Sequence, residues 1–154
     1  MKNSLELRIN PPFQMLISVV LIFITSRLLP SSVALLEYKW LISSVLMAIG
    51  LIIIMAGLFS FHFAKTTGNP DKPESVSALV SSGIYRITRN PMYVGLIFLL
   101  LAWGAWLGSF FSIIIVALFQ QYTTRFQIIP EEKALSKLFP QEYQAYCENV
   151  RRWL

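Results

Sequence analysis

The sequence contains little that could support metal or disulfide chemistry. Its 154 residues include one cysteine, Cys147, and one histidine, His62. A single cysteine cannot form an intrachain disulfide, and one Cys with one His cannot supply the ligands of a zinc site. We therefore expect no resident metal ion and no disulfide framework.

Charged residues are also scarce, since they make up 14% of the chain while apolar residues make up 55%. This balance argues against a soluble domain and is typical of an integral membrane protein. Four membrane spans of roughly 20 residues each would use roughly 80 residues. Too little chain would remain for a separate soluble catalytic domain of ~100 residues or more, so any activity must lie in or against the bilayer.

The motifs of nucleotide-binding and nucleic-acid-binding domains are missing as well. The chain has no GxGxxG, and it lacks the aromatic and basic spacing of an RNA-binding module. Its net charge of +5 is better explained by loops that lie at an anionic cytoplasmic leaflet. We expect membrane lipids as partners and no nucleic acid.

Four apolar stretches predict an all-α integral membrane protein formed by the whole chain, 1–154, as one membrane-embedded domain. The first is too long for a signal h-region and lacks a cleavage site, so we expect it to be retained. The glycines of Gly104–Ser109 favour a reversal that makes the last two spans a helical hairpin. The polar tail predicts a cytoplasmic amphipathic C-terminal helix that begins at Pro130. The expected spans are 13–29, 40–63, 92–107 and 109–129, and the expected cytoplasmic segments are 65–91 and 130–154.

The distribution of positive charge predicts the orientation. Eleven of the 13 Lys and Arg residues fall in the segments that four spans place on one side, and only Arg27 and Lys39 fall on the other. By the positive-inside rule, the N- and C-termini are cytoplasmic. Labelling reagents that cannot cross membranes should then miss Cys147 in intact cells.

Polar residues gather in two cytoplasmic segments, 79–93 and 125–153. Each residue has an ordinary structural explanation: Asn90 as a helix N-cap, arginines as anchors, and tyrosines as interfacial residues. Together they predict a ligand site. Helix starts at Asn90 and Pro130 would offer N–H groups to an anion, arginine would bind a carboxylate, and tyrosine faces could meet adenine or a sulfonium cation.

An ordered set of motifs from about residue 60 onward resembles the isoprenylcysteine carboxyl methyltransferase family, a relative of the membrane phospholipid methyltransferases. The motifs are Thr66-Thr67-Gly68-Asn69-Pro70, Leu79-Val80-Ser81-Ser82-Gly83-Ile84-Tyr85-Arg86, Arg89-Asn90-Pro91-Met92-Tyr93-Val94-Gly95, Glu131-Glu132 with Leu135, and Phe139 through Tyr143, Tyr146, Val150 and Arg151. Two positions depart from the family pattern: Asn90 replaces a common histidine, and Phe139-Pro140 replaces Phe-Gly.

The resemblance implies an S-adenosylmethionine-dependent methyltransferase that acts on a lipophilic small molecule or lipid-modified substrate at the cytoplasmic membrane face. It implies catalytic roles for Glu131 and Glu132, and for Arg125 in steering the acidic group of the acceptor, although Gln127 lies nearer the position of the family's arginine. The cofactor-binding residues that it implies are Leu79, Val80, Tyr85, Arg89, Asn90, Pro91, Met92, Tyr93 and Glu131.

Other functions stay open at this point. Membrane sterol and steroid reductases carry a similar C-terminal segment and use NADPH, although they are usually longer. A four-helix exporter or a non-enzymatic scaffold would also fit the spans. All eight acidic residues fall at or outside the span ends, which counts against proton-coupled transport. The sequence leaves open the acceptor, the choice among O-, N- and S-methylation, and the oligomeric state.

Overall fold

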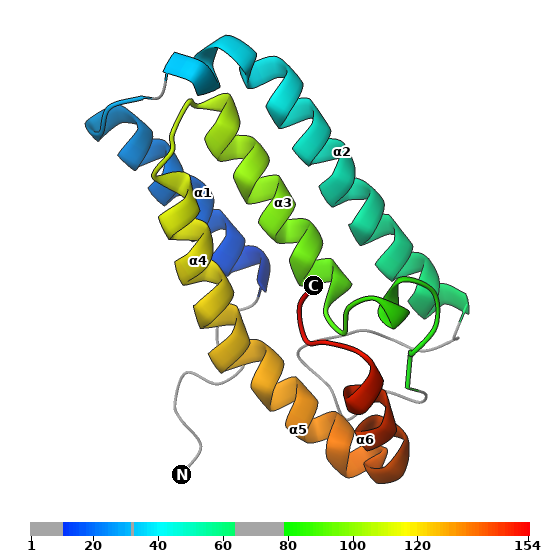
Figure 1. Cartoon of the computed structure of the whole chain (residues 1–154). Coiled ribbons are helices and arrows are strands. Elements are labelled where there is room, and N and C mark those ends of the chain that lie inside the picture. Colours follow the sequence, from blue (N-terminus) through cyan, green and yellow to red (C-terminus); the bar gives the residue numbers. More distant parts are fainter. Residues whose placement is uncertain (1–10, 32, 64–78) are drawn as a thin grey trace.

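The computed structural model describes residues 11–31, 33–63 and 79–154, and the regular structure in these ranges is helical. Four helices pack side by side (Figure 1), and the remaining elements gather at one end of this bundle. The bundle helices are α1 (Pro11–Leu28), α2 (Val33–Phe63), α3 (Pro91–Trp106) and α4 (Ser112–Thr123). The end elements are the 3₁₀ helix η2 (Gly83–Arg86), the π-helical turn η3 (Thr124–Ile128), α5 (Ile129–Leu138) and α6 (Pro140–Asn149).

Each predicted apolar stretch corresponds to one bundle helix, with ends that agree or are shifted by up to seven residues. Among the described residues, two helices are long and apolar enough to cross a membrane, over Pro11–Leu28 and Glu37–Phe63. Helix α3 is apolar but shorter. Much of the predicted cytoplasmic segment 65–91 lies outside the described residues, which resume at Leu79.

The predicted reversal between α3 and α4 is present, and its two glycines have different roles. Ser109 N–H donates to Gly104 O at 2.9 Å and Gly108 N–H to Ala105 O at 3.0 Å, the two bonds of a Schellman motif. Gly108 has a φ of +66°, which favours glycine. A Cβ on Gly104 would collide with Ser112 Oγ on α4. The GxxxG pattern therefore builds a turn and a close contact within the chain.

Small residues also bring α2 and α3 together. A Cβ on Gly95 would collide with Ile54 and would lie 2.8 Å from Gly50 O, so the two backbones nearly touch at this crossing. On the other side of α3, a core of Ile22, Leu100, Ile115, Val116 and Phe119 joins α1, α3 and α4. Helix α3 is thus the central helix of the bundle.

Large apolar side chains cover the outward faces of the bundle. More than half of the surface of Leu16 on α1, Leu41 and Ile52 on α2, and Leu118 on α4 is exposed. Apolar surface spread over several helices in this way would be unfavourable in water and is suited to lipid. The outward faces therefore agree with the membrane character of the sequence.

The structure corrects the expected start of the tail helix at Pro130. Helical backbone continues without a break from α4 through η3 into α5, because the residues that flank η3 are all in the right-handed helical region. Ile129 N–H donates to Thr124 O, five residues back. Pro130 has no N–H to offer Phe126 O, and the π-helical turn accommodates this missing bond. Pro130 is consequently not a free helix start, and the predicted anion site there is wrong.

The single amphipathic tail helix is also corrected, since the tail consists of two helices. Phe139 leaves the helical region with φ −130° and ψ 63°, and Pro140 begins α6. A proline at the first helical position suits a new helix, because the amide that it lacks would have no partner there. The sharp bend turns α6 back toward η2 and the start of α3 (Figure 1).

Candidate functional site

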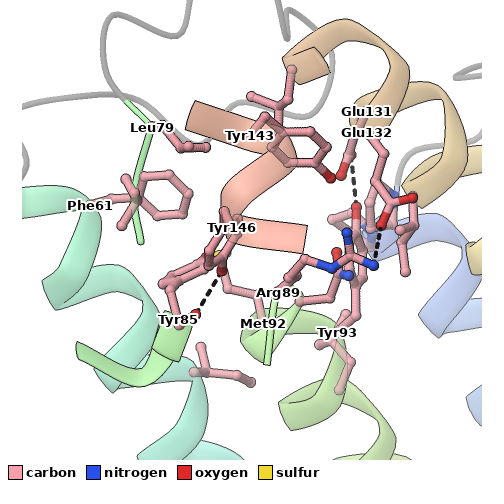
Figure 2. Close-up of a pocket in the computed structure, with 18 of the residues that line it drawn as sticks. Phe61, Leu79, Tyr85, Arg89, Met92, Tyr93, Glu131, Glu132, Tyr143 and Tyr146 are labelled. Carbon is pink, nitrogen blue, oxygen red and sulfur yellow. Dashed lines mark hydrogen bonds and ion pairs between the residues drawn. The ribbon is translucent and has the colours of Figure 1, made fainter. Parts of the chain in front are cut away.

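A cavity of about 460 Å³ lies at the polar end of the bundle, where helices from both halves of the chain converge. Figure 2 shows side chains from α2, η2, α3, α5 and α6 pointing into it. Its wall is mostly apolar and aromatic, with a few charged groups. The lining residues are Pro11, Pro12, Met15, Ile54, Phe61, Leu79, Val80, Tyr85, Arg89, Asn90, Met92, Tyr93, Leu96, Ile128, Glu131, Glu132, Leu135, Tyr143 and Tyr146.

One carboxylate of the acidic pair, Glu131, faces the start of α3. Its Oε1 accepts a hydrogen bond from Tyr93 Oη at 2.9 Å and another from Gln127 Nε2 at 2.8 Å. Gln127 belongs to η3 and is 1% exposed. The π-helical turn therefore contributes directly to the site, because it carries a buried amide that orients a cavity carboxylate.

The second carboxylate, Glu132, joins two arginines from distant segments. Arg152 donates to both of its oxygens, with Nε–Oε1 at 3.0 Å and Nη2–Oε2 at 2.7 Å. Arg89 Nη2 lies 3.5 Å from Oε1. These hydrogen bonds to Glu132 raise the pKa of Arg152. Glu132 thus bridges α5, the start of α3 and residues 150–153, which follow α6.

Arg89 connects the cavity to α6. Its Nη1 donates to Cys147 Sγ, while its Nε is buried and has no hydrogen-bond partner among the described residues. A buried guanidinium N–H without a partner is uncommon. Arg89 also lines the cavity.

Three tyrosines make up much of the aromatic wall. Tyr146 Oη donates to Tyr85 O at 2.7 Å and ties α6 to η2, and the Tyr85 ring meets Phe61 edge to face with centroids 5.4 Å apart. Burial raises the pKa of Tyr85, Tyr143 and Tyr146 above the ordinary value of 10.0. They are neutral phenols at physiological pH, and their rings offer stacking surfaces to an aromatic or cationic ligand.

The structure brings most of the predicted site residues together in this cavity. Two do not line it: Pro91 is fully buried as the first residue of α3, and Arg125 is exposed on η3, where its guanidinium lies 5.8 Å from the Phe126 ring. Asn90 holds the predicted N-cap position, but its side chain makes no cap bond and donates to Arg152 O instead. Those that line it are Leu79, Val80, Tyr85, Arg89, Asn90, Met92, Tyr93, Glu131 and Glu132.

Sequence reasoning missed several members of the site. The charge distribution predicts only a cytoplasmic position for Arg152, and the apolar pattern places Phe61 and Met15 in membrane spans. No local signal in the sequence marks Arg152 or Phe61 as part of the site. In the described parts of the chain, no three His, Cys, Asp or Glu side chains gather as a metal site would require.

Comparison with known proteins gives two matches. The profile of the phospholipid methyltransferase family matches residues 38–142, which is more than half of the chain and includes most of the cavity residues. A protein of Haemophilus influenzae described as "Uncharacterized protein" is 43% identical over 63 residues, or 41% of this chain and 100% of that protein. No solved structure matches the chain significantly.

Proposed function

Because the chain belongs to the phospholipid methyltransferase family, which indicates a membrane methyltransferase, we propose that it transfers a methyl group from S-adenosylmethionine to a lipophilic acceptor. The observation that carries this proposal is the convergence of the motif residues on one cavity at the polar end of an apolar bundle. The proposed acceptor resembles an isoprenylcysteine carboxylate or another lipid-like molecule.

The residues present fit S-adenosylmethionine. A cavity of about 460 Å³ lies within the range of about 300–1,000 Å³ that is usual for small-molecule sites. Its aromatic wall suits an adenine ring, and the carboxylate of Glu131 suits a sulfonium or ammonium group. The buried Nε of Arg89 has no partner among the described residues and suits the ligand's carboxylate. The adenine ring, one cationic group and the carboxylate of the ligand therefore each have a complementary group in the wall.

When bound, S-adenosylmethionine supplies an electrophilic methyl group on a positively charged sulfur. The side chains would act by positioning and by excluding water rather than by covalent chemistry. Tyr93 and Gln127 hold one oxygen of Glu131 in place, so that the carboxylate is oriented before the ligand arrives. The apolar wall around it lowers the local dielectric, which favours a reaction in which charge is lost.

Arg125 would serve the acceptor and not the cofactor, since it is exposed on η3 and does not line the cavity. In this proposal it attracts an acidic acceptor to the membrane surface. Arg125→Gln should then lower kcat/KM for an acidic lipophilic acceptor and leave the affinity for S-adenosylmethionine unchanged. An unchanged kcat/KM would remove Arg125 from the mechanism.

We further propose that α1, α2, α3 and α4 all cross the membrane, with the cavity on the cytoplasmic side. Trp40 and Trp106 meet at the opposite end with centroids 4.2 Å apart, and Lys39 lies 5.8 Å from the Trp106 ring. Tryptophans and a snorkelling lysine are typical of a membrane interface.

This topology can be tested with two introduced cysteines at exposed positions in a Cys147→Ser background. In intact cells, an impermeant maleimide should label Ser31→Cys, near the tryptophan end, and should not label Ser136→Cys on α5 until the membrane is permeabilised. Labelling of both positions, or the reverse pattern, would overturn the proposed orientation.

Ligand binding by the purified protein tests the cofactor assignment. Calorimetry should detect S-adenosylmethionine, and Glu131→Gln and Tyr93→Phe should weaken it by about tenfold, the effect of losing a hydrogen bond to a charged group. Glu148→Gln and Tyr38→Phe make the same chemical changes at exposed positions away from the cavity and serve as controls. Stabilisation by NADPH in place of S-adenosylmethionine would favour a reductase. If the folded protein binds neither S-adenosylmethionine nor NADPH, a scaffold or an exporter would remain as the function.

The acceptor is best identified without assuming its class. Protein should be incubated with radiolabelled S-adenosylmethionine and a lipid extract of the host, and the labelled product identified. Label on a carboxylate ester would support an isoprenylcysteine-like acceptor, whereas label on an amine or a thiol would assign a different substrate class. A folded protein that binds the cofactor but labels nothing in the extract would contradict the proposed lipid substrate.

A further inference from the structure

We propose that Arg152 is a positioning residue that fastens residues 150–153 to α5, and that these residues hold the loop 88–90 against the cavity. The inference rests on the proposed function, since it concerns the wall of the proposed cofactor site. Arg152 itself does not line the cavity. It would act through two groups that do, Glu132 and the loop that carries Arg89 and Asn90.

The first support is the geometry of the ion pair. Arg152 and Glu132 form two parallel hydrogen bonds, at 3.0 Å and 2.7 Å. The carboxylate side chain is 16% exposed and the guanidinium 38%. A two-bond pair of this kind fixes orientation as well as distance, which a lysine ammonium cannot do. The contact therefore sets where residues 150–153 lie relative to α5.

The second support is the main chain that Arg152 carries. Its carbonyl oxygen accepts hydrogen bonds from Thr88 Oγ1 at 3.2 Å and from Asn90 Nδ2 at 3.0 Å. The neighbouring Arg151 carbonyl accepts from Arg89 N–H at 3.0 Å. Two successive carbonyls thus satisfy three donors of a loop more than 60 residues earlier in the chain. The loop between η2 and α3 owes its position to this contact.

The third support is that both arginines share one carboxylate. Arg89 Nη2 lies 3.5 Å from Glu132 Oε1, the same oxygen that Arg152 Nε contacts. Glu132 therefore lies between two cations: Arg89, which lines the cavity, and Arg152, which does not. Without the Arg152 side chain, the carboxylate would be free to rotate toward Arg89, and the carbonyls that hold the loop would lose their anchor.

The test compares two neighbouring arginines with different roles. Arg152→Gln removes the pair with Glu132, whereas Arg151→Gln removes an equal charge from an exposed side chain whose carbonyl stays in place. Hydrogen–deuterium exchange of residues 87–90 should be about tenfold faster in Arg152→Gln and unchanged in Arg151→Gln, because local opening becomes easier. This measurement needs no ligand. Arg152→Lys should exchange at an intermediate rate.

Binding and coupling complete the test. The Kd for S-adenosylmethionine should rise about tenfold in Arg152→Gln, and adding Glu132→Gln should have less than an additive effect, since both changes remove the same contact. Exchange rates and affinities equal to those of Arg151→Gln would overturn the inference. If Arg152→Gln does not fold, Arg152→Lys gives the same comparison. Faster exchange in a protein that does not bind S-adenosylmethionine at all would retain the positioning role and reject the proposed function.

Discussion

The bundle and the polar end of the molecule are stabilised by different interactions. In the bundle, α1, α3 and α4 meet mainly through apolar side chains, with one hydrogen bond from Thr123 to Gln14 and one from Trp103 to Val19 O. Helix α2 meets α3 through glycine backbones. At the polar end, hydrogen bonds and ion pairs join residues far apart in sequence, such as Tyr146 with Tyr85 and Arg152 with Glu132. Apolar packing restricts the volume of a side chain more than its chemical type. A hydrogen bond or ion pair, in contrast, requires particular donor and acceptor atoms.

The largest effect is expected where the bundle tolerates no added volume. Gly95→Val should destabilise the protein by about 3 kcal/mol, because its side chain would collide with Ile54 and would approach Gly50 O closely. Chemical unfolding in detergent micelles measures this. Ala117→Val adds a similar volume on the exposed face of α4 and should have little effect. Equal effects of the two changes would show that the α2–α3 crossing is not closely packed.

Loss of one charge at the polar end should lower the free energy of unfolding more than loss of one methyl group in the bundle. Glu132→Gln should cost about 2 kcal/mol, since it weakens the contacts of two arginines at once. Ile115→Val, in the core of the bundle, should cost about 1 kcal/mol. The same unfolding measurement applies to both. A larger loss of stability for Ile115→Val than for Glu132→Gln would contradict the contrast between the bundle and the polar end.

A single neutral hydrogen bond should contribute less. Tyr146→Phe removes the bond to Tyr85 O and should cost about 1 kcal/mol with little change in volume. Tyr38→Phe makes the same change on an exposed part of α2 and is the matched control. A shift in the midpoint of thermal unfolding for Tyr146→Phe alone would attribute the effect to the bond between η2 and α6.

The buried phenols are expected to have the smallest effect. Their ionisation changes the stability of the protein only at alkaline pH. Burial raises the pKa of Tyr85 and Tyr146 above 10.0 in the folded protein, so the unfolded chain releases these protons first. Their contribution to stability is therefore complete below pH 10 and decreases as the pH rises further. Thermal unfolding between neutral and strongly alkaline pH, followed with tyrosinate absorbance, measures this decrease. Tyr146→Phe should reduce it.

The helices and most of the cavity wall could be predicted from the sequence, because apolar runs and short motifs are local signals. The turn at Gly108 follows from such a signal, whereas the grouping of Tyr93 with Glu131 is implied by the family resemblance of their motifs. The part that could not be predicted depends on backbone geometry. Nothing local indicates that Pro130 lies inside a continuous helix. Pro140 is a local signal for a break at Phe139, but it does not predict that the second tail helix brings Arg152 to Glu132.

The π-helical turn at Thr124–Ile128 has a consequence for how this chain can vary. One additional residue in a helical turn rotates everything that follows by roughly 100° around the axis. The stripe of α4 that packs against α1 and the stripe of α5 that carries Glu131 and Glu132 are therefore not in one continuous register. Removing a single residue from this turn would change the direction of both carboxylates while leaving the apolar pattern of α4 unaltered. The length of the turn, as much as its residue types, selects which side chains face the cavity.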